Sequence, residues 1–494
     1  MIQSASGMRK TLWAAVLVAG ACLISFRSTY EPDLWWHLAH GRETTAGHFV
    51  RTNVFSAAYR DYPQPYTSWL FDLISYVLWM RVGPAGIQAL QALLIALSLG
   101  LIAAACRIRS SVAATVAVCA FGWIVIEPRA LPRPHLVSFA GMAATIYLIE
   151  RSRIAGTWRP LLWMLPVTVA WANFHVECVF GVATVGLFAA GEWIRPRSLG
   201  RAASQGALLI AAGCAAATLL TPYGVGLWRY TFENSAVPRL LNIAELQPPY
   251  LPNYRGFFAL TALTLGGCLL RWRRLSLFDA AAIVLFGALG WRYLRLTPLL
   301  FFAAAPFVAQ CLDELGDLRK PGQSRFPLGK PRLSRLWGVS AAAVALLLSR
   351  VPMTTLVRGV QIGGDALEPG DVFSPEAMRF ARDHHLSGPA FTSINLGGYV
   401  AWYLYPGAQV FIDSRLQAYP PEHFAAVSRA AGDPDGWDTL TQNLDWAVLS
   451  VPRVNPFSGT GRFDERFWAA AYNDRAIAIL VRRHGRYGGL TAGE

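Results

Sequence analysis

The residues from Tyr30 to Arg42 combine acidic, aromatic and imidazole side chains directly after an apolar run. Pro32 suits the first turn of a helix, because it has no N–H group to leave unsatisfied and its φ angle is already helical. Glu31 and Asp33 would be stabilised at that end by unpaired backbone N–H groups and the helix dipole. One face of this helix carries residues at positions i, i+3, i+4 and i+7, which are Asp33, Trp36, His37 and His40.

Two interpretations of this face are open. An interfacial helix would anchor its tryptophans among lipid headgroups and leave its charged groups in water. A functional site is the alternative, because an aspartate, a tryptophan and two histidines on one face make an unusual surface if they are only solvated.

Composition predicts a polytopic membrane protein. Of 494 residues, 54% are hydrophobic and only 15% are charged, and the chain has 18 Trp and 26 Phe. Residues 351–494 hold 12 Arg and 15 acidic residues, which is a net charge of −3. Because the whole chain has a net charge of +14, residues 1–350 carry a net charge of +17. We expect this basic region to face anionic lipid headgroups rather than nucleic acid. The seven cysteines lie in apolar segments and form no disulfide or zinc-binding pattern.

Apolar segments long enough to span a bilayer occupy the first 357 residues. The first, 11–26, follows Met8-Arg9-Lys10, and the positive-inside rule therefore places the N-terminus in the cytoplasm. Residues 27–66 would form an extracytoplasmic loop with two short amphipathic pieces. The further apolar segments are 67–82, 84–106, 111–127, 134–150, 160–194, 203–221, 256–271, 278–291, 293–311 and 336–357.

The number of spans follows from the breaks and from the basic loops. Segment 160–194 is long enough for two spans with a break near Asn173-Phe174-His175, and 278–311 is either a broken hairpin or two short spans. The basic loop 312–335 is predicted to be cytoplasmic, so the total is odd, about 11 or 13. The basic stretches near 107–109 and 150–159 conflict with this count, because they cannot all lie inside.

Residues 358–494 have the pattern of a small extracytoplasmic α/β domain. Ser374-Pro375-Glu376 is a typical helix start. Alternating strands and helices favour a largely parallel sheet. Strands are predicted at Ala390–Ile394, Gln409–Ile412, Trp446–Val451 and Ile477–Val481, and helices at 375–385, 398–404, 420–431 and 463–471.

Ionisable residues in apolar segments are costly and are therefore candidates for function, although each could be a loop residue just outside the bilayer. Asn173 is a further candidate for function, because a break in the middle of the apolar segment 160–194 would expose polar backbone to a cavity. The ionisable candidates are Arg129, Arg133, His135, His175, Glu177, Glu245, Arg292 and Arg295.

Two predicted strands end in polar residues, where open α/β sheets gather ligands. Asp413 and Arg415 follow the strand 409–412, and Tyr399 follows the strand 390–394. These side chains are candidates for binding an acceptor. The alternative is a turn in which Asp413 and Arg415 hold the domain together.

The order of these features resembles the GT-C superfamily of membrane glycosyltransferases, which includes protein O-mannosyltransferases, aminoarabinose transferases and oligosaccharyltransferases. In this superfamily an acidic pair, here Glu31 and Asp33, opens the first extracytoplasmic loop. The chain is similar to uncharacterised bacterial proteins of this group. The matching segments are Asp33–Leu38, Gly41-Arg42, Phe55-Ser56, Trp69-Leu70, Arg133–Leu136, Trp171–His175, Thr221–Gly224 and Phe411–Arg415.

The resemblance implies transfer of a sugar from a polyprenyl-phosphate carrier to a glycan, lipid or protein acceptor outside a bacterial cytoplasmic membrane. It makes Asp33 the general base, with Glu31 and His37 in the catalytic set. Glu31 and Asp33 could instead hold a divalent cation, Mg²⁺ or Mn²⁺. The residues expected to bind the lipid phosphate and substrate are Arg133, His135, Asn173, His175, Glu245, Arg292 and Arg295. A transporter or flippase of lipid-linked saccharides, or a non-catalytic scaffold, would need the same cavity but no base.

Overall fold

The structure is a computed structural model, and it describes residues 20–23, 25–64, 67–233, 244–318, 361–430, 434–451 and 463–490. The chain divides into two compact units. The helical unit comprises Met1–Arg27, Gln88–Gly224 and Ile243–Val360, and the sheet unit comprises Ser28–Ile87, Val225–Asn242 and Gln361–Glu494. The domain boundary expected at 357/358 stays a prediction, and residues 28–87 pack with the C-terminal part of the chain.

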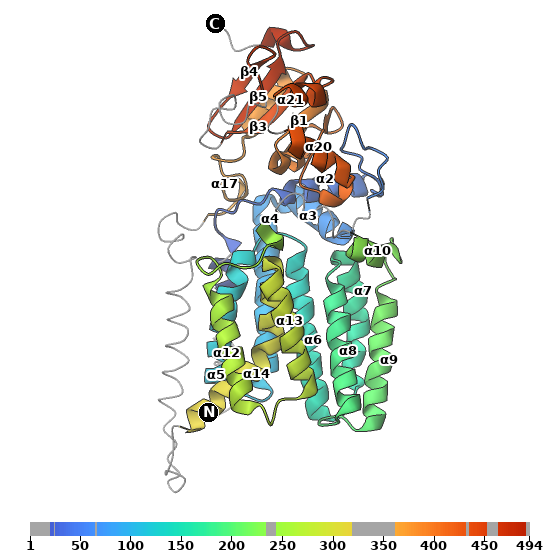
Figure 1. Ribbon diagram of the computed structural model, residues 1–494, viewed down its shortest axis with the longest axis vertical. Helices are drawn as coiled ribbons and strands as arrows, with labels where there is room; N and C mark the ends of the chain where they lie inside the picture. The colour runs from blue at the N-terminus through green and yellow to red at the C-terminus, as the bar shows by residue number, and fades with distance from the viewer. Residues whose placement is uncertain are drawn as a thin grey trace. The chain divides into compact units, whose positions relative to one another are not determined.

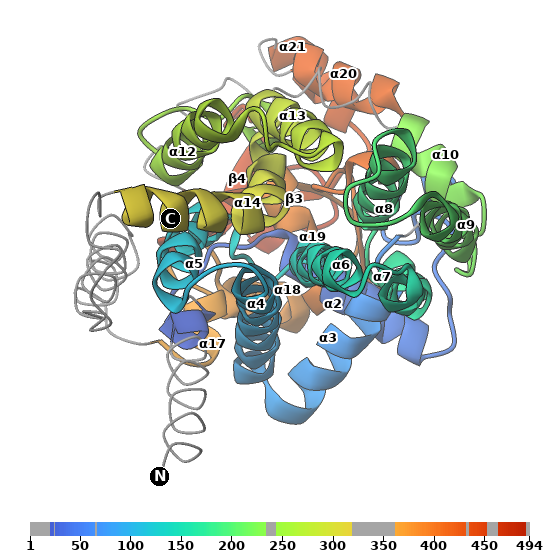
Figure 2. The same ribbon diagram turned by 90° about the horizontal axis from the view of Figure 1, so that it is seen from below.

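The helices of the helical unit run side by side and alternate in direction (Figure 1). Helix α14 lies among the others when the unit is viewed along the helices (Figure 2), and it packs against α5, α6, α12 and α13. The helices are α4 (Pro84–Arg107), α5 (Val112–Ile126), α6 (His135–Ala155), α7 (Met164–Phe174), α8 (Cys178–Ile194), α9 (Arg201–Ala217), α12 (Arg255–Arg271), α13 (Leu277–Arg292) and α14 (Thr297–Leu318). Short 3₁₀ turns connect or extend them, namely η1 (Glu127–Arg129), η2 (Arg159–Trp163), η3 (Ala244–Leu246) and η4 (Leu294–Leu296).

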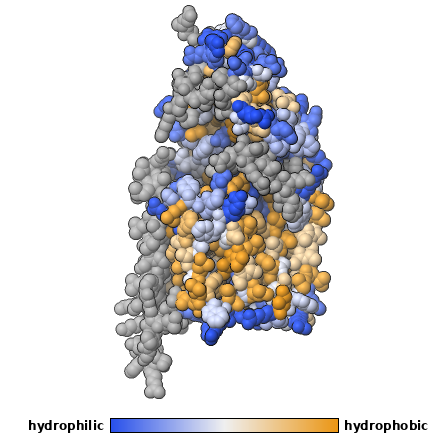
Figure 3. Space-filling view, in the orientation of Figure 1, coloured by the Kyte–Doolittle hydropathy of each residue, from blue (hydrophilic) through white to orange (hydrophobic). Residues whose placement is uncertain are grey.

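Three helical stretches of the described residues are long and apolar enough to cross a membrane by length and composition, namely Pro84–Arg107, Val112–Arg129 and Leu294–Glu314. Apolar side chains predominate on the face of the helical unit that Figure 3 shows, and hydrophilic ones gather at the lower helix ends. Several helices of the unit carry exposed leucines, for example Leu93 on α4, Leu209 on α9 and Leu269 on α12. Exposed apolar patches mark sites of contact with other proteins or with a membrane.

The breaks predicted inside long apolar segments are confirmed. Segment 160–194 forms α7 and α8, which are separated by His175, Val176 and Glu177. Segment 278–311 forms two helices, α13 and α14, joined through η4 and packed against each other. The predicted spans 11–26 and 336–357 lie wholly or mostly outside the described residues.

The basic stretches that conflict with the predicted span count lie at one end of the helical unit. Segment 67–82 forms α3 (Trp69–Val82), which belongs to the sheet unit and not to the row of parallel helices. With that segment removed, the stretches near 107–109 and 150–159 are separated by two antiparallel helices and lie at the same helix end (Figure 1). The basic turns 195–201 and 271–274 lie there too.

The sheet unit contains one five-stranded mixed sheet in the order β2-β1-β3-β5-β4. Strand β1 (Gly388–Thr392) is parallel to β2 (Ala408–Val410) and β3 (Trp446–Ser450), whereas β5 (Ile477–Arg482) is antiparallel to β3 and β4 (Trp468–Asn473). The expectation of a largely parallel sheet is therefore wrong for its second half. Asp474 closes the β4–β5 hairpin, because its Oδ1 accepts the N–H groups of Ala476 and Ile477 at 2.7 and 2.8 Å.

The predicted helix 463–471 is also wrong, because its second half forms β4. The run Trp468-Ala469-Ala470-Ala471 has helix-forming alanines, but its side chains are needed beside β5 and the core. Such packing overrides local propensity. The other helices of the sheet unit are α2 (Asp33–Thr45), α10 (Gly226–Glu233), α17 (Gly364–Leu367), α18 (Pro375–Asp383), α19 (Gly397–Leu404), α20 (Pro421–Ala430) and α21 (Pro434–Thr441).

Helix α2 is part of the core of the sheet unit and packs against α3 and α19. Trp35 is fully buried, and its ring meets Tyr399 edge-on at a centroid distance of 4.8 Å. The helices approach so closely that a Cβ atom on Gly398 would lie 3.1 Å from the backbone nitrogen of Trp36. The glycine therefore permits α19 to lie against the start of α2.

Candidate functional site

Asp33 begins α2 and is held there by two short hydrogen bonds. Its Oδ1 accepts a hydrogen bond from the Ser414 hydroxyl at 2.6 Å, and its backbone N–H donates to Glu31 Oε1 at 3.0 Å. Glu31 is buried and binds the first turn of the helix, whereas Asp33 is only partly buried. The carboxylate of Asp33 is thus oriented by a neighbour 381 positions later in the chain. Ser414 lies within the motif Phe411–Arg415 but was not predicted as a site residue.

His37 and His40 both approach Asp72 on α3. His37 Nδ1 lies 2.6 Å from Asp72 Oδ1, and His40 Nδ1 lies 3.8 Å from Asp72 Oδ2. The three side chains are buried, so the solvated interpretation of this helix face is wrong for both histidines. Sequence reasoning missed Asp72, since an acid in an apolar helix 35 positions away is its only signal.

Burial shifts the pKa values of Asp72 and His40 in opposite directions. It raises the pKa of Asp72 well above its usual value. It lowers the pKa of His40 well below its usual value, and the Arg415 guanidinium and His37 add to that shift. His40 is therefore neutral, with Nε2 accepting from Arg415 at 3.5 Å and the proton assigned to Nδ1.

Replacing His40 with glutamine is expected to reduce the acid sensitivity of the protein. Because the pKa of His40 is depressed by folding, the unfolded chain binds a proton that the folded chain excludes below about pH 6.5. The free energy of unfolding therefore falls as the pH decreases, by up to about 1.4 kcal/mol per pH unit. Asp72 acts oppositely, since its raised pKa costs stability as pH rises above about 3.9. Melting temperatures between pH 7.5 and 5 would measure the difference.

The exposed His48 provides the control for this experiment, since its side chain is 75% exposed on the segment that follows α2. His48→Gln should keep the pH profile of the wild type, while His40→Gln flattens the acid side. Parallel profiles for all three proteins would contradict the assignment of a buried neutral His40.

Asp413 and Arg415 form a fully buried ion pair after β2. Arg415 donates from Nε to Asp413 Oδ1 at 3.0 Å, and its two terminal nitrogens donate to Asn53 and Gln64 at 2.8 and 3.2 Å. Tyr419 donates its hydroxyl to Asp413 Oδ2 at 2.9 Å. These contacts tie residues 53–64 to the end of β2, as in the alternative of a stabilising turn. A role in acceptor binding stays a prediction.

Tyr399 and Gly397 define the other strand exit. Tyr399 is fully buried, and its hydroxyl donates to Glu368 at 2.9 Å. A Cβ atom on Gly397 would lie 2.3 Å from the Asp413 Cβ and 2.7 Å from the Ile412 carbonyl oxygen. Gly397 therefore lets α19 lie against the turn that carries Ser414.

The helical unit gathers a second polar cluster at the helix ends opposite the basic turns. Arg129 and Arg133 both donate to Glu245 Oε1, at 2.9 and 3.0 Å. Burial opposes ionisation of Glu245, but Arg133 and Arg129 hold its pKa well below the usual range. His135 donates from Nε2 to the Arg129 carbonyl at 2.6 Å. Three predicted residues, Arg133, His135 and Glu245, are thus brought together.

The turn between α7 and α8 extends this cluster. His175 Nδ1 lies 2.8 Å from the Ser138 hydroxyl, which also accepts from Trp171 Nε1 at 2.9 Å. Burial opposes ionisation of Glu177, but His175, followed by Arg295 and His135, lowers its pKa to about 2. Arg295 and His175 therefore act electrostatically on the same carboxylate.

Two predicted residues have other contacts. Asn173 donates from Nδ2 to the carbonyls of Val169 and Leu220, at 2.8 and 2.9 Å, and thereby links α7 to the chain after α9. Arg292 is exposed, with its guanidinium 4.9 Å from the Tyr293 ring.

The described residues do not form a metal site of their own. Among residues 20–23, 25–64, 67–233, 244–318, 361–430, 434–451 and 463–490, no group of three or more His, Cys, Asp and Glu side chains could hold an ion. Glu31 Oε1 and Asp33 Oδ1 both accept hydrogen bonds from the protein. Each carboxylate has a second oxygen as well, and the Mg²⁺ or Mn²⁺ ion considered from the sequence stays a prediction.

Comparison with known proteins shows similarity at the level of structure. No family model and no curated protein sequence matches the chain. The oligosaccharyltransferase AglB from Archaeoglobus fulgidus, solved with an inhibitory peptide and a dolichol-phosphate, superposes with a TM-score of 0.59 at 11% identity. The match covers 90% of this chain and 70% of AglB.

Two further structures of the Archaeoglobus fulgidus oligosaccharyltransferase agree with this result. The apo form gives a TM-score of 0.55, and the form tethered to an acceptor peptide gives 0.53, both at 12% identity. Each match covers 90% of this chain and 70% or 69% of the enzyme. The chain therefore shares the fold of these oligosaccharyltransferase structures, which is the kind of fold that the resemblance in its sequence predicted.

Proposed function

We propose that this protein is a membrane glycosyltransferase that moves a sugar from a polyprenyl-phosphate carrier to an acceptor outside a bacterial cytoplasmic membrane. The observation that carries the proposal is the fold shared over 90% of the chain with AglB, which was solved with dolichol-phosphate. The contacts of Asp33 and of the Arg129–Arg133–Glu245 cluster support it from the chain's own residues.

The proposed topology has eleven spans. They are the nine helices α4 to α9 and α12 to α14 of the described residues, together with segments 11–26 and 336–357. The helices other than α4, α5 and α14 are short or polar, but the apolar face of the unit that Figure 3 shows suits lipid. By the positive-inside rule, the arginine-rich turns after α4, α6, α8 and α12 face the cytoplasm. The chain at the opposite helix ends, which includes 27–87, is then extracytoplasmic.

Asp33 is the proposed general base. The acceptor oxygen forms a bond to the anomeric carbon of the sugar, the bond between that carbon and the carrier phosphate breaks, and the acceptor proton passes to the carboxylate. The Ser414 hydroxyl fixes one carboxylate oxygen at 2.6 Å, and the partly exposed side chain can meet an acceptor. His37, paired with Asp72, holds the same helix face in place. No step of the proposal passes through a metal ion.

The arginines of the helical unit are the proposed site for the leaving phosphate. Arg129 and Arg133 converge on Glu245, and Arg295 acts on Glu177 nearby in the same unit. Guanidinium groups suit phosphate because they offer paired N–H donors in one plane. A phosphate that enters this cluster would share the arginines with Glu245. Tyr399, Asp413 and Arg415 remain candidates for organising the acceptor side.

The test is release of the lipid carrier. We expect purified protein incubated with a mixed polyprenyl-phosphate-sugar extract to bind lipid and to accumulate free polyprenyl phosphate, measured by mass spectrometry. Replacing both Arg129 and Arg133 with glutamine should reduce the co-purified lipid. An Arg255→Gln variant controls for loss of one exposed arginine at a helix start. Bound lipid without any carrier release from the wild type would favour a transporter or scaffold.

A further inference from the structure

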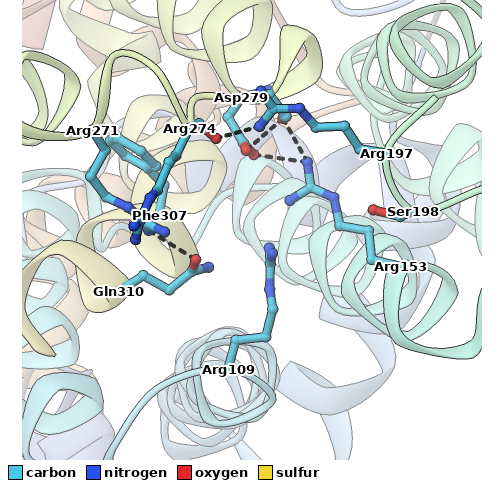
Figure 4. A pocket seen from close by; sticks show the side chains of 10 residues that line it. Arg109, Arg153, Arg197, Ser198, Arg271, Arg274, Asp279, Phe307 and Gln310 are labelled. Carbon is cyan, nitrogen blue, oxygen red and sulfur yellow. Dashed lines mark hydrogen bonds and ion pairs between the residues drawn. The ribbon is translucent and has the colours of Figure 1, made fainter. Parts of the chain in front are cut away.

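The turns of the helical unit line a pocket of about 200 Å³ (Figure 4). By the order of the helices, the pocket lies at the end of the unit opposite the Arg129–Arg133–Glu245 cluster. Five arginines line it, and they come from the ends of different helices. Arg109 follows α4, Arg153 belongs to α6, Arg197 lies between α8 and α9, and Arg271 and Arg274 lie at and after the end of α12. The other lining residues are Ser198, Ser276, Asp279, Phe307 and Gln310.

Carboxylates neutralise only part of this cluster. Arg153 is buried and paired with Glu150 at 2.8 Å and with Asp279 at 3.0 Å, while Arg109 shares Glu150 at 2.6 Å. Arg271 contacts Glu314 at 3.2 Å. Glu192 lies beside Arg197, because its Oε2 accepts the backbone N–H groups of Arg197 and Ser198 at 3.0 and 2.8 Å. Five arginines thus face four carboxylates, which leaves an excess of one positive charge.

The excess charge is concentrated on Arg197 and Arg274. Arg274 is 74% exposed and reaches Glu314 only at 3.5 Å. Arg197 is exposed, forms no ion pair within the described residues, and donates from a guanidinium nitrogen to the Arg274 carbonyl. A cleft lined by one sign of charge concentrates counter-ions of the opposite sign.

We propose that this pocket binds a phosphate-type anion at the cytoplasmic ends of the helices. Its volume is below the roughly 300–1,000 Å³ of pockets that hold drug-sized ligands, so a phosphate or diphosphate group fits and a nucleotide sugar does not. The arginine forks supply bidentate donors for such a group. Because the lining side chains come from α6, α12, α13, α14 and the adjoining turns, the bound anion ties these helix ends together.

The ligand group could belong to a soluble compound or to a phospholipid, since basic pockets between helices also bind lipid headgroups. The test uses the full-length protein in nanodiscs of zwitterionic phosphatidylcholine. We expect inorganic pyrophosphate to raise the melting temperature by roughly 2–4 °C over sodium chloride of equal ionic strength. In a second arm, phosphatidylglycerol replaces part of the lipid without added pyrophosphate. A rise in the first arm identifies a soluble ligand, and a rise only in the second identifies a headgroup.

The variants Arg197→Gln and Arg274→Gln, singly and together, should remove the rise in whichever arm shows it. Both side chains are exposed, so these variants are expected to fold. Arg195→Gln is the matched control, because Arg195 is an exposed arginine of the same turn that does not line the pocket. An equal rise in the double variant, or no rise in either arm, would overturn the proposal. Carrier release by Asp33 is measured separately and does not enter this test.

Discussion

Replacing Asp33 with asparagine is expected to slow carrier release by about 10²–10⁴-fold, which is the usual contribution of a general base. Asparagine has the size of aspartate, and its side-chain oxygen can still accept from the Ser414 hydroxyl. It cannot take a proton from an acceptor, however. The lipid should still bind, because the proposed phosphate residues belong to the helical unit. Mass spectrometry of bound lipid and of released polyprenyl phosphate measures both quantities in one sample.

Asp61→Asn is the matched control for this variant. Asp61 is an exposed aspartate in the same unit of the chain, and the substitution makes the same change of charge. We expect wild-type release from Asp61→Asn and a smaller decrease from Ser414→Ala, which frees the Asp33 carboxylate to rotate. Release at the wild-type rate from Asp33→Asn would exclude Asp33 as the base.

The start of α2 could be predicted because its determinants are local. Pro32 and the flanking acids mark the first turn, and the structure begins the helix at Asp33 with Asp33 N–H bound to Glu31. The burial of His37 and His40 could not be predicted, because it depends on Asp72 in another helix. Spacing shows which side chains share a face, but it does not show what covers that face.

The sheet shows the same limit. The strands at β1, β2, β3 and β5 were predicted because each is a short apolar run between turn residues. Strand β4 was missed, since its alanines favour a helix when they are considered alone. Its pairing with β5 also decides that half of the sheet is antiparallel. Short segments are therefore predictable in type only where propensity and packing agree.

The individual residues of the Arg129–Arg133–Glu245 cluster were predicted from the sequence, but the contacts between them were not. Arg133, His135 and Glu245 were chosen because ionisable groups are costly in apolar segments. Their contact through Arg129 and Glu245 joins parts of the chain more than 100 positions apart. The five-arginine pocket was not predicted at all. Two of its members, Arg109 and Arg153, belong to the basic stretches that conflicted with the predicted span count, in which α3 was included as a span.

Replacing Arg415 with methionine is expected to lower the free energy of unfolding by about 3–5 kcal/mol, the usual cost of breaking a buried ion pair. The guanidinium is 1% exposed, and it satisfies Asp413, Asn53 and Gln64 together. Methionine leaves the buried Asp413 carboxylate without its counter-charge. The melting temperature and far-ultraviolet circular dichroism of the purified protein would measure the loss.

The chain contains a control with the same spacing. Asp464 and Arg466 also form an Asp-x-Arg pair, with Arg466 Nε donating to Asp464 at 2.8 Å, but the Arg466 side chain is 75% exposed. Water solvates both charges there, so Arg466→Met should leave the melting temperature essentially unchanged. Equal losses from the two variants would show that the spacing itself stabilises the turn. A loss confined to Arg415→Met would show that burial of the ion pair stabilises the end of β2.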